Sequence, residues 1–168
     1  MDEMEVIAGY FQDCAQFIQD NVSCICTHDK LSCIDLIYSL QMRHRLPEMF
    51  QDLTVYCDMQ PFGKECPSRP FSGLVLNFCV STRGHRDFID HRICVVIPYG
   101  NWTGGDICLY ELGLVIALNP GDILIFKSCD ITHFNLHFEG QRGSIVLHSD
   151  RAGQKWVQTK NGWGNHIS

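Results

Sequence analysis

The spacing of hydrophobic residues divides the chain into two parts. Near the N-terminus, apolar residues recur every three or four positions over Met4–Ile18, the spacing of one face of an α-helix. Ser32 and Asp35 then have the spacing of a helix-capping box, and the apolar set that follows them stops before Pro47. We therefore expect a second helix that ends near Arg45, with Pro47 opening a short third helix.

After Pro70 the pattern changes to short runs rich in β-branched and aromatic residues, each closed by turn residues. This pattern is typical of strands joined by tight turns. The expected strands are Leu74–Val80, Ile93–Ile97, Ile107–Tyr110, Leu114–Leu118, Ile123–Phe126, His133–Phe138 and Ser144–His148. The expected turns fall at Pro98–Gly100, Gly104–Gly105, Pro120–Gly121 and Glu139–Gly140.

Together the two parts predict one α+β domain, in which N-terminal helices pack on the outside of a double-stranded β-helix, or jelly roll. A chain of 168 residues has the length of a single ordinary domain. Within it we expect mainly helical support over residues 1–53, the jelly-roll core over 70–150 and a C-terminal tail over 151–168.

The composition is that of a folded globular protein, with 45% hydrophobic and 19% charged residues. No apolar run approaches the roughly 18 residues that a membrane span needs, and the acidic start does not resemble a secretory signal. We therefore expect an intracellular monomer with no membrane partner. Its ten cysteines would be reduced in that compartment.

The net charge of −6 argues against a protein coated with positive charge for non-specific binding to nucleic acid. Five of the 19 acidic residues, however, lie in the first 20 positions, which contain no Lys or Arg. The rest of the chain has 13 basic and 14 acidic residues, so it is nearly neutral. Arginines gather between Arg83 and Arg92, and basic residues again beyond Arg142. The acidity therefore does not exclude an enzyme that acts on a nucleobase.

The pattern with the clearest chemistry is His85-Arg86-Asp87. Alternate residues of an extended chain point to the same side, so His85 and Asp87 can bind one ion while Arg86 points away. His133, on a later expected strand, would supply a third ligand, and His137 on the same strand face is the alternative. Two histidines and one carboxylate on one face of an octahedron leave three positions open, as in non-haem Fe(II) oxygenases.

A possible anion site follows the third ligand. Arg142 lies nine residues beyond His133, across the expected hairpin turn, and Ser144 faces the same way. A guanidinium can bind a carboxylate through two parallel hydrogen bonds, and the serine hydroxyl can add another. A dicarboxylate with one end on the metal and the other on Arg142 fits this pattern.

The order His85-x-Asp87, His133, Arg142-x-Ser144 resembles the signature of Fe(II)- and 2-oxoglutarate-dependent dioxygenases. The flanking sequence is similar to the Tet/JBP nucleic-acid-base oxygenases, above all to their compact forms in mushroom-type fungi. The resemblance covers Leu74 to Trp163, more than half of the chain. The segments that carry it are Ser81–Asp90, Gly104–Asp106, Leu109–Gly113, Gly121–Phe126 and Ser144–Asp150.

The resemblance implies an enzyme that uses Fe(II), 2-oxoglutarate and dioxygen. In that family, 2-oxoglutarate chelates the iron through its 1-carboxylate and 2-oxo group, and its distal carboxylate pairs with the arginine. The residues that would bind iron are His85, Asp87 and His133, and those that would bind 2-oxoglutarate are Arg142, Ser144 and Asn77.

The resemblance also implies a substrate, namely a methylated base in DNA. The most direct reaction would convert 5-methylcytosine to 5-hydroxymethylcytosine and beyond, after the base is flipped out of the duplex. It further implies a nuclear location. Asp90 and His91 would contact the base, and Arg83, Arg86 and Arg92 would contact phosphates.

Several alternatives stay open at the level of sequence. The same scaffold could demethylate N6-methyladenine, or hydroxylate a protein or a small molecule, and a non-enzymatic jelly-roll binding module is a third class. Asn77 could contact the base instead of 2-oxoglutarate. His148 could line the cosubstrate site or lie in the core or behind the ligands. Trp102, Trp156 and Trp163 could stack on a base, but pack loops more readily.

Most of the ten cysteines are predicted to fill the core rather than bind metal. Cys79, Cys94 and Cys108 alternate with apolar residues in expected strands. The group Cys24, Cys26, His28 and Cys33 lacks the usual spacing of a structural zinc site.

Overall fold

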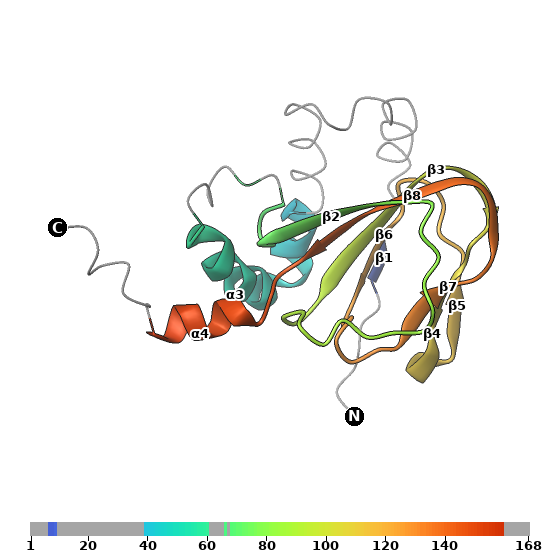
Figure 1. Cartoon of the computed structure of the whole chain (residues 1–168). Helices are drawn as coiled ribbons and strands as arrows, with labels where there is room; N and C mark the ends of the chain where they lie inside the picture. The colour runs from blue at the N-terminus through green and yellow to red at the C-terminus, as the bar shows by residue number, and fades with distance from the viewer. Residues whose placement is uncertain (1–6, 10–38, 61–65, 67, 160–168) are drawn as a thin grey trace.

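Two antiparallel sheets face each other in the computed structural model, which describes residues 7–9, 39–60, 66 and 68–159 (Figure 1). The larger sheet has the order β1-β6-β3-β8-β2, and the smaller has the order β5-β4-β7. The strands are β1 (Ile7–Gly9), β2 (Gly73–Phe78), β3 (Cys94–Gly104), β4 (Ile107–Leu109), β5 (Leu114–Ile116), β6 (Ile123–Phe126), β7 (His133–Asn135) and β8 (Phe138–His148). The helices are α3 (Pro47–Asp58), the 3-10 helix η3 (Tyr110–Leu112) and α4 (Ala152–Thr159).

The predicted α+β class and the jelly-roll arrangement of two sheets are confirmed. Helices α3 and α4 lie next to each other at the end of the larger sheet away from β4, β5 and β7 (Figure 1). None of the described helices is long and apolar enough to cross a membrane. The boundaries expected at 53, 70 and 150, the monomeric state and the intracellular location stay predictions.

The N-terminal prediction is partly wrong. Ile7–Gly9 form a strand, β1, and not part of a helix. The edge of β6 offers these residues backbone partners, with Ile7 opposite Ile125, and this pairing overrides the helical spacing of the side chains. The rest of the expected first helix and the Ser32–Asp35 box lie outside the described residues.

The next two predictions are confirmed. Residues 39–45 are helical and Leu46 is not, so the second helix ends where Pro47 requires it. Pro47 then occupies the first turn of α3, where its missing N–H would have had no partner in any case. Phe50 and Leu53 of α3 are buried against the larger sheet.

All seven expected strands are present, but β3 is longer than expected because Pro98–Gly100 does not turn the chain. The carbonyl of Pro98 accepts a hydrogen bond from Gly121 N–H, so the side of Pro98 that lacks a donor faces away from β8. No hydrogen bond of the β3–β8 ladder is therefore lost at the proline. Gly100 keeps the strand paired with a φ of +114°, a conformation that favours glycine.

A second boundary is also corrected. Glu139–Gly140 lies inside β8, opposite Thr103 and Trp102, and is not a hairpin turn. The expected strand is instead interrupted at residues 136 and 137, which separate β7 from β8. The long β3–β8 ladder extends pairing beyond the point where local sequence predicts a turn.

The larger sheet has two buried faces. Val95, Ile97 and Tyr99 of β3 belong to a cluster that includes α3. The alternate residue Cys94 packs with Leu124 and Phe126 of β6 in a second cluster that reaches the smaller sheet. The cavity described below opens on this second face, which Cys94 and Val96 line.

The cysteine predictions have mixed outcomes. Cys94 and Cys108 are buried as expected. Cys79 is exposed, because the chain leaves β2 there with a φ of +51°. Cys24, Cys26, His28 and Cys33 lie outside the described residues.

Candidate metal centre and anion site

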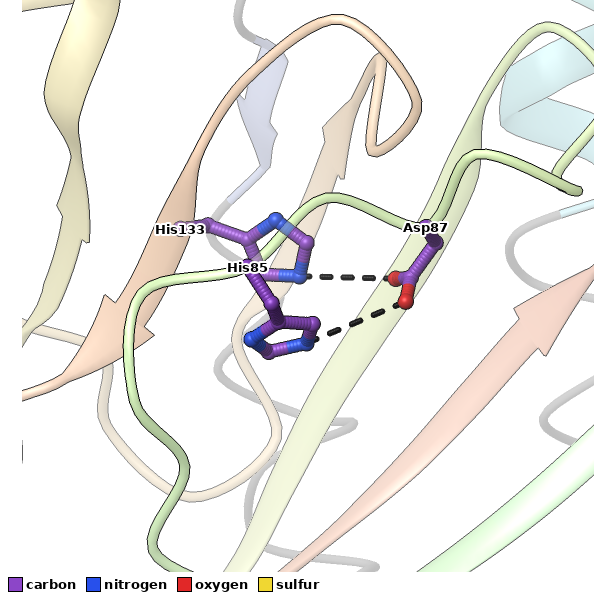
Figure 2. A group of neighbouring side chains, drawn as sticks. All are labelled: His85, Asp87 and His133. Carbon is purple, nitrogen blue, oxygen red and sulfur yellow. Dashed lines mark ion pairs between the residues drawn. The ribbon is translucent and has the colours of Figure 1, made fainter.

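Three side chains converge in the cavity: His85, Asp87 and His133 (Figure 2). Nε2 of His85 lies 3.8 Å from Asp87 Oδ1, and Nε2 of His133 lies 3.5 Å from Asp87 Oδ2. The three ligand atoms all lie within 4.8 Å of one another. Such a group can surround one metal ion, as the sequence pattern predicts.

The backbone holds the two histidines side by side. His85 belongs to the loop after β2, and His133 begins β7. They form an isolated antiparallel bridge, in which His133 N–H donates to His85 O at 2.9 Å and His85 N–H donates to His133 O at 3.2 Å. The two imidazole rings are consequently only 4.4 Å apart, measured between their centres.

Each imidazole is oriented by a backbone carbonyl behind it. His85 Nδ1 lies 2.9 Å from Arg83 O, and His133 Nδ1 lies 3.0 Å from Ile131 O. A carbonyl oxygen can only accept, so Nδ1 carries the proton in each neutral ring. The lone pair of each neutral ring is therefore on Nε2, the atom that faces Asp87. Outer hydrogen bonds of this kind fix the tautomer of metal-binding histidines.

Electrostatics keeps Asp87 in the form that binds cations. The hydrogen bond with His133 lowers the pKa of Asp87, although burial opposes the shift. Burial in turn lowers the pKa of His133, but the adjacent Asp87 outweighs it and the net shift is upward. Both shifts favour the charged forms of Asp87 and His133 in the metal-free protein, and a divalent cation that binds His133 Nε2 would displace the proton from that nitrogen.

His137, the alternative third ligand, is not brought to this group. It lies in the exposed connection between β7 and β8, and its carbonyl accepts a hydrogen bond from Gly105 N–H. The break in the expected strand after Asn135 moves it away from the face that His133 occupies.

A cavity of about 320 Å³ contains the three ligands. One wall is β8, which contributes alternate residues along its length, and another is β2. The residues from β8 are Arg142, Ser144, Val146 and His148, and those from β2 are Val75 and Asn77.

The Arg142 guanidinium is buried in this cavity without an anionic partner. Arg142 is only 5% exposed, and its Nε has no hydrogen-bond acceptor. No carboxylate among the described residues pairs with it, and burial lowers its pKa. Aromatic rings flank it instead, with the guanidinium carbon 5.5 Å from the centre of Trp102 and 5.9 Å from that of Phe138. A buried, unpaired cation is unfavourable, so this site fits an anionic ligand.

Two neighbours shape the anion site. Ser144 is buried, and its hydroxyl accepts a hydrogen bond from Asn77 Nδ2 at 3.3 Å. Gly105 packs against the Arg142 side chain, since a Cβ atom added there would lie 3.2 Å from Arg142 Cδ. Arg142, Ser144 and Asn77 are thus together in the cavity, as predicted.

Asp90 also lines the cavity, but protein groups already contact both of its oxygens. Its Oδ2 accepts a hydrogen bond from Ser128 Oγ at 2.5 Å, and its Oδ1 lies 3.2 Å from His148 Nδ1. The contact with Asp90 raises the pKa of His148, although burial opposes the shift. Of the positions that the sequence allows for His148, the structure shows the one that lines the cavity, and its spacing of six residues from Arg142 places it on the same face of β8.

His91 is not brought to the cavity. Its ring packs on Tyr56 of α3 at 4.6 Å between centres, and its Nε2 lies 3.2 Å from Asp52 Oδ2. Residues 90 and 91 point in opposite directions, as neighbours in an extended segment do, so only Asp90 faces the cavity.

The three predicted phosphate contacts have different environments. Arg92 Nε pairs with Asp52 Oδ2 at 2.9 Å. Arg86 pairs with Glu111 and donates to Thr132. Arg83 is exposed, and of these three arginines it alone has no ion pair within the described part of the chain.

No protein-family model and no curated protein matches the chain. Among solved structures, it resembles NgTET1, determined in complex with 5mC DNA, with a TM-score of 0.54 and 16% identity over 67% of this chain and 48% of that one. An oxidoreductase of the 2OG-Fe(II) oxygenase family from Burkholderia pseudomallei has a TM-score of 0.42 and 23% identity over 48% of this chain and 44% of that one. The chain spans about half the length of NgTET1, and the likeness at this identity extends to the fold alone.

Proposed function

We propose that the chain is an Fe(II)- and 2-oxoglutarate-dependent oxygenase. The proposal rests on one observation: a His-Asp-His ligand set and a buried, unpaired guanidinium share a single cavity. This combination suits a metal with open coordination positions and a dicarboxylate that spans from it to Arg142. When bound, iron would supply the oxidation of a C–H bond by dioxygen, coupled to decarboxylation of 2-oxoglutarate.

In this proposal the chain's own residues bind and orient the reactants. His85, Asp87 and His133 hold the iron. Arg142 pairs with the distal carboxylate of 2-oxoglutarate, and this gives the buried guanidinium an anionic partner. Ser144 adds its hydroxyl, and Asn77 orients that hydroxyl through the hydrogen bond between them.

For the substrate we propose a methylated base in DNA, in the first place 5-methylcytosine. Val75, Val80 and Ile89 give the cavity apolar walls that suit the faces of a flipped base. His148, whose Nδ1 lies 3.2 Å from Asp90 Oδ1, offers its imidazole to the edge of the base. This assigns Asp90 to holding His148, because protein groups already contact both of its oxygens. A nuclear location goes with this substrate.

The test is turnover on defined oligonucleotides. The protein is incubated with Fe(II), 2-oxoglutarate and ascorbate, together with DNA that carries 5-methylcytosine, N6-methyladenine or no modified base. Succinate and the released nucleosides are measured by mass spectrometry. We expect succinate and 5-hydroxymethylcytosine to form together, and only with the 5-methylcytosine DNA.

Controls separate the parts of the proposal. His133→Ala should abolish turnover, whereas His137→Ala, which alters an exposed histidine four residues away, should retain it. Succinate formation that no DNA stimulates would indicate a protein or small-molecule substrate. Absence of both iron binding and succinate would favour a binding module and overturn the proposal.

A further inference from the structure

A second polar cluster lies behind the metal ligands, formed by Arg86, Glu111 and Thr132. Glu111 Oε2 accepts a hydrogen bond from Thr132 N–H at 2.6 Å, and Oε1 accepts one from Thr132 Oγ1, also at 2.6 Å. Arg86 donates from Nη2 to Glu111 Oε1 and from Nε to Thr132 Oγ1, the latter at 3.0 Å. The three side chains therefore form a closed hydrogen-bonded network.

The members of this network are next to the metal ligands in the sequence. Arg86 lies between His85 and Asp87, and Thr132 directly precedes His133. The cluster thus joins the two segments of chain that supply the ligands, and none of its three side chains lines the cavity. Its third member, Glu111, belongs to η3, whose first residue Tyr110 donates its N–H to Thr132 O at 2.9 Å.

We infer that Glu111 is a positioning residue for the metal centre, which acts by fixing Arg86 and Thr132 and through them the spacing of the three ligands. The inference rests on the metal centre of the proposed function. It also gives Arg86 a role different from the phosphate contact expected from the sequence.

The network affects the geometry of the metal centre more than the stability of the fold. Metal ligands must be held close to their productive positions by neighbours whose own conformations are fixed. Without Glu111, Thr132 N–H loses its acceptor and Arg86 loses its anion. The two ligand-bearing segments then keep the His85–His133 bridge and the Arg86–Thr132 hydrogen bond, but lose the carboxylate that fixes Arg86 and Thr132 together. Loss of outer partners of metal ligands typically lowers metal affinity about 10- to 100-fold.

A merely structural role would give a different result. The side chains of Arg86 and Glu111 are 37% and 32% exposed, and ion pairs at this exposure contribute little to folding. A structural role would therefore change neither metal affinity nor, to any large extent, stability. The affinity for the metal is the readout that separates the two roles.

The experiment measures Mn²⁺ binding by calorimetry, without 2-oxoglutarate or DNA, because Mn²⁺ is a redox-stable substitute for Fe(II). We expect Glu111→Ala and Arg86→Ala each to weaken Mn²⁺ binding about 10- to 100-fold. Glu111→Gln, which keeps one acceptor for Thr132 N–H, should recover part of the loss. The control is Asp58→Asn, which disrupts another partly exposed Arg–carboxylate pair, Arg69–Asp58, and should bind Mn²⁺ like the wild type.

The double variant Arg86→Ala/Glu111→Ala should bind little more weakly than either single variant, because both remove the same network. If Glu111→Ala does not fold, Thr132→Val is measured in its place and should also weaken binding. This variant removes the hydroxyl that donates to Glu111 and accepts from Arg86, but keeps the backbone N–H. Wild-type affinity in Glu111→Ala, or in Thr132→Val if it is used, would overturn the inference while leaving the metal centre intact. Failure of the wild-type protein to bind Mn²⁺ would overturn the metal centre itself and with it the proposed function.

Discussion

The guanidinium of Arg142 lies 5.5 Å from the ring centre of Trp102 and pairs with no carboxylate of the described residues. The ring stabilises the cation in part, but it cannot accept the in-plane N–H donors of the guanidinium. The Nε–H of Arg142, which has no acceptor among the described residues, can therefore donate to a ligand. A cavity wall that offers Arg142 an aromatic ring and, within the described part of the chain, no carboxylate therefore favours an anionic cosubstrate.

The first prediction concerns the binding of the anionic cosubstrate by Arg142. Arg142→Gln should weaken 2-oxoglutarate binding by about 1.5–3 kcal/mol, roughly 10- to 150-fold in Kd, because a charged hydrogen-bond donor is lost. Arg142→Lys should recover only part of this, since an ammonium lacks the planar fork. Calorimetry with Mn²⁺-loaded protein measures the effect. Mn²⁺ affinity itself should not change, and equal 2-oxoglutarate affinity in both variants and the wild type would contradict the assignment.

The second prediction concerns the charge of His148. Its contact with Asp90, aided by Asp87 and Asp150, raises its pKa above the ordinary value of 6.5, although burial opposes the shift. The stabilisation from the Asp90–His148 pair is therefore fully present below about pH 6.5 and is lost as the pH rises through the raised pKa. Urea unfolding of metal-free wild-type protein and His148→Gln should differ most at the acidic end of this window and converge above it.

NMR titration of the His148 ring provides the matching control. Asp90→Asn should move the pKa of His148 back toward 6.5, while Asp87 and Asp150 still raise it. A pKa at or below 6.5 in the wild-type protein would contradict this account of the pair.

The third prediction concerns the unexpected extension of β3. Gly100 has a φ of +114°, and a Cβ atom there would lie 2.2 Å from Gln141 O. Gly100→Ala should therefore lower the free energy of unfolding by about 1–3 kcal/mol or more, through backbone strain and a backbone clash. Gly113→Ala is the control, because its φ is +63° and nothing lies within 4 Å of the added atom. It should cost about 1 kcal/mol, and equal stability of the two variants would be the contrary result.

The fourth prediction separates the arginines near the cavity. Arg83 is exposed without an ion pair among the described residues, whereas Arg92 pairs with Asp52. Arg83→Ala should weaken binding to methylated duplex DNA and reduce the slope of log K against log salt by about one. Arg92→Ala should have the smaller effect on both. A larger change in Arg92→Ala, measured by fluorescence anisotropy over a salt series, would reverse the assignment.

The grouping of His85, Asp87 and His133 could be predicted because its signal is local. His85 and Asp87 are two residues apart, so in an extended chain their side chains point to the same side. His133 begins a run with strand character, and the alternation of side chains along that run gives its direction. The same alternation places Arg142, Ser144 and His148 on one face of β8, where all three line the cavity. The turns at Pro98–Gly100 and Glu139–Gly140 were predicted wrongly, because long-range pairing of β3 with β8 overrode local turn residues.

The arginine environments could not be predicted for a different reason. Arg86 pairs with Glu111 and Arg92 with Asp52, residues 25 and 40 positions away in the sequence. Nothing near either arginine specifies those partners, because only the packing of the 84–92 loop against η3 and α3 brings them together. His91 faces α3 for the same reason.

The alternation along β8 has a consequence for the dimensions of what the cavity can hold. Arg142 and His148 are six residues apart on one face of a single strand, a separation of about 20 Å at the usual rise per residue. The length of β8 therefore fixes the distance between the backbone positions of Arg142 and His148, the residues proposed to bind the anion and the substrate. Inserting one residue between Ser144 and His148 would rotate His148 out of the cavity, whereas inserting two would restore its direction and lengthen this distance by about 6.6 Å.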